Sequence, residues 1–145
     1  MKGSVGAARH DVMKKLCFSL IVLMLVFGSV SAIAAPNSVN GWDAGNESGL
    51  LAITNPQYTT SSVNGNCYVI SGYCKSGASV SVYKLSASGS YDMIIAPAAV
   101  GASGIFFRSV TLASGKNSFV VRAQVGDKYQ QSRFDIFCFG FNKIY

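Results

Sequence analysis

Two short motifs in the middle of the chain match the consensus patterns of active-site motifs in serine acyl-enzymes. Ser81 and Lys84 form an S-x-x-K pattern, and a K-[ST]-G pattern at 75–77 precedes them. In enzymes that use these motifs, S-x-x-K opens a helix and K-T-G follows much later, whereas here the order is reversed. Ser81 and Lys84 also belong to a strand-like run, in which side chains three positions apart point to opposite faces. We interpret the two motifs as a coincidence.

The sequence contains a single histidine, His10, which precedes the apolar N-terminal segment. The rest of the chain therefore lacks the base of a Ser-His-Asp triad or a Cys-His pair and the commonest zinc ligand. Asp43 and Glu47 could bind calcium, but two carboxylates without the spacing of an EF-hand loop are more typical of a solvated loop. These observations predict a protein that is not an enzyme and that has no metal site and no cofactor.

The N-terminal residues 1–34 have the pattern of a signal peptide. A basic start at 13–15 precedes an unbroken apolar run at 16–28, and the small residues at 32–34 form an A-x-A motif. This order of basic, apolar and small residues is typical of an export signal. The predicted location is therefore extracytoplasmic, either secreted or at the cell surface.

The position of the cut and the start of the chain both have alternatives. We predict cleavage after Ala34, because Pro36 next to the scissile bond would make a cut after Ala35 unfavourable. A start at Met13 would make residues 1–12 a spurious upstream extension. The competing interpretation is an uncleaved membrane anchor, since residues 16–35 are about long enough to span a bilayer.

The chain that follows the predicted signal peptide is mildly basic. Residues 35–145 carry eight basic and five acidic side chains, a net charge of +3. The basic residues are scattered and form neither a run nor a stripe, so the electrostatic footprint of a nucleic-acid-binding protein is missing. About 110 residues are enough for one domain with its own core. We expect one domain that does not bind nucleic acid.

Apolar and polar residues alternate with a period of two from Asn66 onward, and turn residues separate the runs. This pattern predicts an all-β sandwich. Residues 35–62 are polar and are expected to form a leader, either a tether or a loose first strand. The stretch around 96–99 fits a loop or a broken strand equally well. The predicted strands are 67–73, 78–85, 91–95, 105–112, 118–125 and 131–139.

Two of these runs have a clear apolar face and are separated by a short turn-forming segment. Residues 113–117 provide the turn, and Gly115 can adopt the positive φ that a tight turn requires. We therefore predict that the runs 105–112 and 118–125 pair as a β-hairpin.

Several small, apolar and turn residues follow a fixed order along the chain: Gly72, Gly77-Ala78, Val80, Val82-Tyr83, Gly104-Ile105-Phe106, Val110, Leu112, Gly115, Asn117, Val121 and Ala123. Over 63–136 this order resembles the bacterial immunoglobulin-like domains of exported surface proteins. The resemblance implies a single immunoglobulin-like sandwich of about seven strands over 63–145. It also implies a binding or adhesion module, although fold alone does not fix function. Such domains usually occur in tandem and lack cysteine, whereas here a single domain is predicted and it contains three cysteines.

Three cysteines follow the predicted signal peptide, an odd number for an oxidising compartment. If 67–73 is the second strand of the immunoglobulin-like sandwich and 131–139 the last, Cys67 and Cys138 fall at the same end. We therefore expect a Cys67–Cys138 disulfide. A strand at 67–73 would hold Cys67 and Cys74 about 23 Å apart, beyond the disulfide limit of about 7 Å. Cys74 is left as a buried thiol or an intermolecular one.

The last predicted strand has apolar residues on both faces. Phe134, Ile136 and Cys138 share one face, and a two-layer sandwich buries only one face of each sheet. The opposite face must be covered by the leader or the tail, bound to a partner, or exposed as a patch. Its residues are Phe137, Phe139 and Phe141.

An enzyme or enzyme inhibitor is the function least favoured by the sequence, because histidine is missing after residue 10 and the acidic residues are scattered. Two other functions remain. The first is a binding module for an unknown protein or glycan at the cell surface, with Trp42, Tyr73 and Tyr91 as candidate surface aromatics. The second is a structural or assembly subunit, such as a homodimer, that self-associates through the C-terminal aromatic strand or Cys74. We favour the binding module.

Overall fold

The computed structural model describes residues 34–140. The predicted signal peptide, apart from its last residue, and Phe141 lie outside the described residues. The described chain is all-β, with nine strands in two sheets. No helix within 34–140 is long and apolar enough to cross a membrane.

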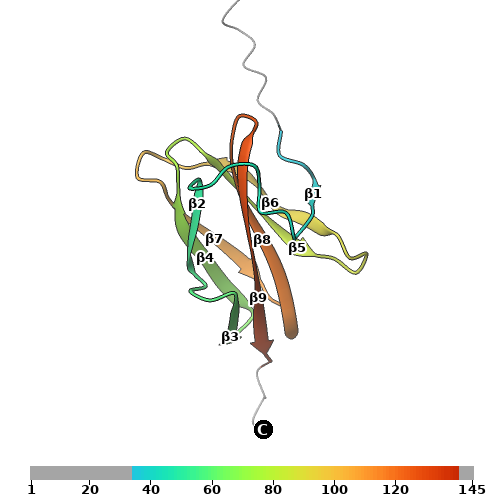
Figure 1. Cartoon of the computed structure of the whole chain (residues 1–145). Helices are drawn as coiled ribbons and strands as arrows, with labels where there is room; N and C mark the ends of the chain where they lie inside the picture. Colours follow the sequence, from blue (N-terminus) through green and yellow to red (C-terminus); the bar gives the residue numbers. More distant parts are fainter. Residues whose placement is uncertain (1–33, 141–145) are drawn as a thin grey trace, which may run out of the picture. The chain divides into compact units, whose positions relative to one another are not determined.

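The larger sheet has six strands and contains both the earliest and the latest strand of the described chain (Figure 1). Its pairs are antiparallel except β3 and β9, which run parallel. In spatial order its strands are β1 (Ser38–Val39), β6 (Tyr91–Ala99), β5 (Ser79–Leu85), β8 (Gly115–Val125), β9 (Lys128–Phe139) and β3 (Thr60–Asn64).

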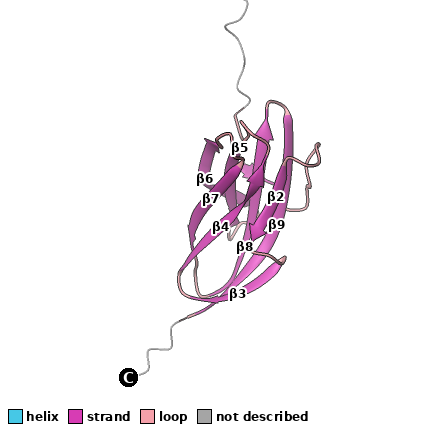
Figure 2. Cartoon of the chain, turned by 90° about the vertical axis from the view of Figure 1, so that its left-hand side faces the viewer, coloured by secondary structure: helices cyan, strands magenta, loops and turns pink. Residues whose placement is uncertain are grey.

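The smaller sheet has three antiparallel strands, and it faces the viewer in Figure 2. Its order is β2 (Leu51–Asn55), β4 (Cys67–Cys74) and β7 (Ile105–Thr111). Alternate residues of both sheets point inward and form one core, as the period of two requires. From the small sheet this core takes Ile70, Phe106 and Val110, and from the large one Val82, Phe119, Val121, Phe134 and Ile136.

All six predicted strands are present as β4 to β9, with ends that differ by a few residues. The stretch at 96–99 continues β6, and Pro97 is tolerated there because β6 is paired along this part on one side only. The segment predicted as a leader supplies β1, β2 and β3. The alternation of apolar and polar residues thus predicted an all-β fold with two sheets correctly. The structure has more of the chain in strands than was predicted.

The predicted hairpin between 105–112 and 118–125 is wrong. Strand β7 pairs with β4 in the small sheet, whereas β8 pairs with β5 and β9 in the large one. The segment between them crosses from sheet to sheet, and the buried Asn117 side chain holds it. Asn117 Oδ1 accepts from Ala113 N at 2.9 Å, and Nδ2 donates to Ala113 O at 2.8 Å. Both runs face the same core. Their alternation of apolar and polar residues is therefore the same whether the two strands pair within one sheet or lie in opposite sheets.

The chain also changes sheets between β2 and β3, near the cis peptide bond Asn55–Pro56. Before that point, the first described residues cross the outer face of the large sheet. There Val39 packs on a second apolar cluster formed by Tyr83, Tyr91 and Val120. The Tyr83 hydroxyl donates to Pro36 O at 2.9 Å. The leader thus covers part of the outer face of the six-stranded sheet.

Candidate binding site

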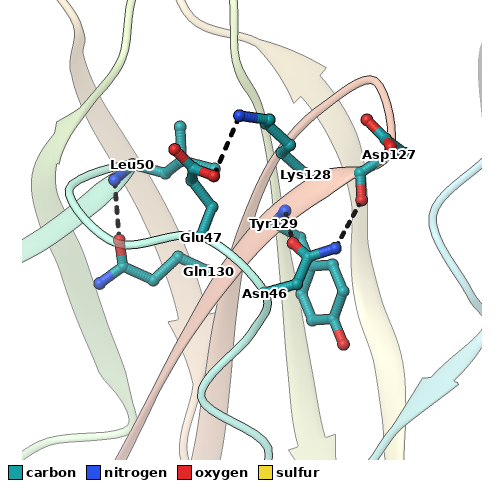
Figure 3. A network of polar contacts seen from close by, with 7 residues as sticks. All are labelled: Asn46, Glu47, Leu50, Asp127, Lys128, Tyr129 and Gln130. Atoms are coloured by element: carbon teal, nitrogen blue, oxygen red, sulfur yellow. Dashed lines mark hydrogen bonds and ion pairs between the residues drawn. The ribbon is translucent and has the colours of Figure 1, made fainter.

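The segment 41–50 is fastened to the turn that joins β8 and β9 (Figure 3). The Asn46 amide donates to Asp127 O at 3.0 Å and accepts from Tyr129 N at 2.8 Å. Gln130 Oε1 accepts from the backbone N–H groups of Leu50 and Leu51 at 2.8 and 2.9 Å. These side-chain and backbone bonds hold the segment against the β8–β9 turn and the start of β9.

Two further contacts tighten this attachment. Lys128 Nζ lies 3.1 Å from Glu47 Oε2 (Figure 3). Gly45 has a φ of +103°, and a Cβ at this position would collide with the backbone of Tyr129 and Gln130. Only glycine allows the segment to lie this close to β9.

Beneath the segment, the outer face of the large sheet carries a closed polar layer around Arg122. This side chain is only 9% exposed. Its guanidinium lies 3.6 Å from the Tyr129 ring centroid, Nε donates to Gln124 Oε1 at 3.1 Å, and Nη1 donates to Gln131 Oε1 at 3.5 Å. Arg122 is therefore surrounded by protein and has a structural role.

Asp43 and Tyr129 join the segment to the same layer. The Tyr129 hydroxyl donates to Asp43 Oδ2 at 2.7 Å, and Gly45 N donates to Oδ1 at 2.9 Å. The hydrogen bond from Tyr129 is the main reason that the pKa of Asp43 is lowered, and the same bond raises the pKa of Tyr129. Asp43 is thus an ionised structural carboxylate. Residues 34–140 contain no group of three or more metal-ligating side chains.

Next to this closed layer lies an open cleft of about 420 Å³. Three segments that are far apart in the sequence form its walls: the segment 41–44, the start of β3 and the middle of β9. Its lining mixes an indole ring with hydroxyl, amide, guanidinium and carboxylate groups. The lining residues are Gly41, Trp42, Asp43, Ala44, Thr59, Thr60, Gln131, Arg133, Phe134 and Asp135.

Trp42 and Arg133 form a stacked pair in the cleft. The Arg133 guanidinium carbon lies 4.0 Å from the centroid of a Trp42 ring and 5.9 Å from that of Tyr91. Trp42 is nevertheless 82% exposed. Within the described residues the Arg133 guanidinium makes ring contacts but no hydrogen bond or ion pair. The aromatic rings therefore orient the guanidinium and leave its N–H donors open.

Asp135, the carboxylate of the cleft, is already paired with another cation. Lys116 Nζ lies 3.0 Å from Asp135 Oδ2. Burial acts to raise the pKa of Asp135, but hydrogen bonds from Ser118 and Lys116 and nearby positive charges outweigh it, so that the pKa is lowered. Arg133 is one of these positive charges, but the ion pair of Asp135 is with Lys116 and not with Arg133.

The other predicted surface aromatics lie away from the cleft or beneath the surface. Tyr91 is 5% exposed and packs in the second apolar cluster, so it supports the stack from below. Tyr73 is exposed on the outer face of the small sheet, next to Ile105 in the register of β4 and β7. Phe137 is half-buried and Phe139 is exposed near the end of β9.

The three cysteines of the described chain are unpaired in this structure. The buried Cys138 Sγ donates to Gly65 O at 3.1 Å, and Cys67 follows Gly65 by two residues at the exposed start of β4. Both thiols thus lie at the same end of the sandwich, although the expected Cys67–Cys138 disulfide is not formed and stays a prediction. Cys74 is half-buried, and burial raises the pKa of its thiol.

The residues of the two enzyme-like motifs lie apart from the cleft. Ser81 is buried beside the Tyr83 hydroxyl, at 3.4 Å, on the outer face of the large sheet. Lys84 Nζ lies instead 5.6 Å from the Phe119 ring centroid, and Phe119 belongs to the inner core. Strand geometry thus separates the two groups that an acyl-enzyme would need in contact.

Comparison with known protein families and with curated proteins identified no relative of this chain. No protein-family model matches the chain, and no curated protein is significantly similar to it in sequence.

The sequence analysis named Trp42 but missed Arg133, Thr59, Thr60 and Asp135. One signal was available, because Gln131, Arg133 and Asp135 alternate with the core residues of the same strand and must therefore share its outer face. The partner segments could not be identified, because no local pattern brings 59–60 beside 131–135.

Proposed function

We propose that this protein is a non-catalytic, secreted or cell-surface immunoglobulin-like binding module that takes its ligand in the cleft at Trp42. The observation that carries the proposal is the Trp42–Arg133 stack. A tryptophan that is mostly exposed leaves a large apolar ring in water, and here the ring lies against the Arg133 guanidinium at the cleft. Rigid aromatic side chains of this kind are enriched at binding sites, because they offer contact area with little loss of conformational entropy.

The order of the strands supports the immunoglobulin-like part of the proposal. Immunoglobulin domains place strands A, B and E in one sheet and C, F and G in the other. With β2 as strand A, the strands β4, β5, β7, β8 and β9 take the places of B, C, E, F and G in the matching sheets. Strand β6 takes the place of C′, which variable-type domains add to the second sheet. Strands β1 and β3 are additions to this scheme.

Binding to arrayed glycans and peptides tests the ligand-binding part. We expect the chain from Ala35 onward to bind a subset of these probes, and Trp42→Ala to abolish that binding. Phe107→Ala is a matched control, because Phe107 is an aromatic residue with 65% exposure on the outer face of the other sheet. Equal binding by the Trp42→Ala variant and the unaltered protein would place the ligand elsewhere.

The location of the protein is a separate part of the proposal and rests on the N-terminal sequence alone. The intact mass of the natively produced protein, separated into medium and membrane fractions, tests it. A species in the medium that begins at Ala35 would support secretion. A full-length chain in the membrane fraction would favour an uncleaved anchor.

Self-association is the second candidate function, and one surface favours it. The outer face of the small sheet carries the exposed side chains of Val69, Tyr73, Ile105 and Phe107. Apolar patches of this kind are typical of interaction sites. A mass that rises with protein concentration in sedimentation experiments would support an assembly subunit. Loss of the dimer in reductant would implicate a cysteine, whereas a strictly monomeric protein would exclude this function.

A further inference from the structure

The cleft contains a guanidinium that is oriented by aromatic rings and has no anion. Arg133 is the group concerned, and its N–H donors have no hydrogen-bond partner within 34–140. A guanidinium presents its donors in a planar fork that matches the two oxygens of a carboxylate. The contact with the Trp42 ring, 4.0 Å from the guanidinium carbon, uses none of these N–H donors.

The charges around the cleft agree with an anionic ligand. Asp135 is compensated by Lys116 at 3.0 Å, and Asp43 by the Tyr129 hydroxyl and Gly45 N. Each acidic group of the lining thus has a partner elsewhere in the protein, although the buried Asp135 Oδ1 itself accepts no hydrogen bond within 34–140. Arg133 forms no ion pair within 34–140, and a bound anion would neutralise its positive charge.

The other lining groups indicate what carries the anion. Thr59 and Thr60 provide exposed hydroxyls, and Trp42 provides an exposed indole ring. Hydroxyls both donate and accept hydrogen bonds, as a ligand rich in hydroxyl groups requires. An indole ring offers flat apolar area for the C–H face of a sugar ring. These groups surround an open cleft within the size range of small-ligand sites.

We infer that the cleft binds an acidic sugar, with the sugar carboxylate on the Arg133 guanidinium and the sugar ring against Trp42. This inference rests on the proposed function and names its ligand class. The contact is reversible and forms no covalent bond. Arg133 sets the preference for acidic over neutral sugars, and Trp42 contributes to the binding of both.

Trp42 is the only tryptophan of the sequence, so its fluorescence reports directly on the cleft. We would titrate the chain from Ala35 onward with oligogalacturonate, and in parallel with a neutral oligogalactose and with oligoglutamate. We expect a saturable change in tryptophan fluorescence with oligogalacturonate, and binding at least tenfold weaker for the neutral sugar. Arg133→Gln should remove this difference between the two sugars, whereas Arg133→Lys should retain part of it.

Lys75→Gln provides the matched control, because it also removes one positive charge but alters an exposed residue outside the cleft lining. This variant should keep the preference for the acidic sugar. Circular dichroism of each variant verifies that it is folded.

Two results would overturn the inference while leaving the proposed function in place. The first is equal binding of the acidic and neutral sugars with no effect of Arg133→Gln. The second is binding of oligoglutamate in preference to oligogalacturonate, which would assign the site to acidic peptides. If no probe alters the fluorescence, the inference is wrong, and the Trp42→Ala array experiment decides separately whether the cleft binds any ligand.

Discussion

Arg122 and Arg133 lie on the same face of the same sheet but have different surroundings. In the register of β8 and β9, Arg122 lies opposite Gln131, and Arg133 lies opposite Val120 two positions along. The guanidinium of Arg122 is enclosed by Tyr129 and two glutamine side chains, whereas that of Arg133 contacts rings only and borders the cleft. Hydrogen bonding therefore distinguishes the two arginines: Arg122 has a structural role, and the recognition role that we propose falls to Arg133.

The leader is the cause of this difference. The leader lies over the sheet at Arg122, whereas at Arg133 it forms one wall of the open cleft. Gln131 connects the two regions, because its Nε2 donates to Asp43 O at 2.7 Å and its side chain also lines the cleft. One stretch of backbone therefore closes one part of the surface and forms a wall of the other.

The largest expected effect is the loss of stability when Arg122 is replaced. Arg122→Ala leaves the oxygens of Gln124 and Gln131 without this donor in a buried layer, so we expect the free energy of unfolding to fall by about 2 to 4 kcal/mol. Urea unfolding measures this change. Arg122→Lys, which retains the charge but not the planar fork, should give an intermediate value. A loss no larger than that of Arg133→Ala would remove the distinction between the two arginines.

Replacement of Gly45 tests whether the close approach of the leader maintains the closed region. Gly45→Ala places a methyl group against the backbone of β9 at a positive φ, so we expect a loss of about 1 to 3 kcal/mol in unfolding free energy. Gly49→Ala is the matched control, since Gly49 also has a positive φ but a Cβ there has nothing within 4 Å. The control should lose less stability, and equal losses would show that only backbone strain matters.

The bond between Asp43 and Tyr129 predicts a pH dependence. The folded-state pKa of Asp43 is lowered, so its contribution to stability is present above the unfolded pKa of about 3.9. That contribution is lost as the pH falls through the lower folded value. The stability difference between the wild-type protein and Tyr129→Phe should therefore be about 1 kcal/mol at neutral pH and shrink in acid. Unfolding curves from pH 7 to pH 2 measure this trend, and a constant difference would contradict it.

The smallest effect on stability is expected at the cleft. Arg133→Ala removes a partly exposed ring contact, so the free energy of unfolding should change by about 1 kcal/mol or less. The preference for the acidic sugar should nevertheless be lost, whereas the Arg122 variants that remain folded should keep it. A large loss of stability would indicate that Arg133 belongs to the structural layer.

The alternation of residues was sufficient to predict the strands but not their partners. The six runs after Asn66 were predicted because each has one face in the core. The hairpin prediction failed, since Phe106 and Phe119 point into the same core from opposite sheets. The sequence also left open what covers the apolar outer residues of the last strand. The leader packs on Tyr83, Tyr91 and Val120 of the same sheet, whereas Phe139 is 59% exposed.

The cleft was harder to predict than the strands. Trp42 was named because an isolated tryptophan in a polar segment is conspicuous, while Arg133 looked like one scattered basic residue among several. Its significance depends on what lies beside it, and these neighbours come from segments about 70 to 90 positions earlier in the sequence. The parallel pairing of β3 with β9 brings together residues that are this far apart in the sequence. This pairing leaves no periodic signal in either strand.

The same pairing has a consequence for the order in which the protein can be completed. Strand β3 has β9 as its only partner in the sheet, and Thr60 lies opposite Asp135. During synthesis, residues 60–64 must therefore wait until the last strand emerges. The attachment of 46–50 to the β8–β9 turn waits for the same event. Strand β3 is therefore completed after strands that follow it in the sequence, and any truncation before residue 135 leaves residues 60–64 without their partner in the large sheet.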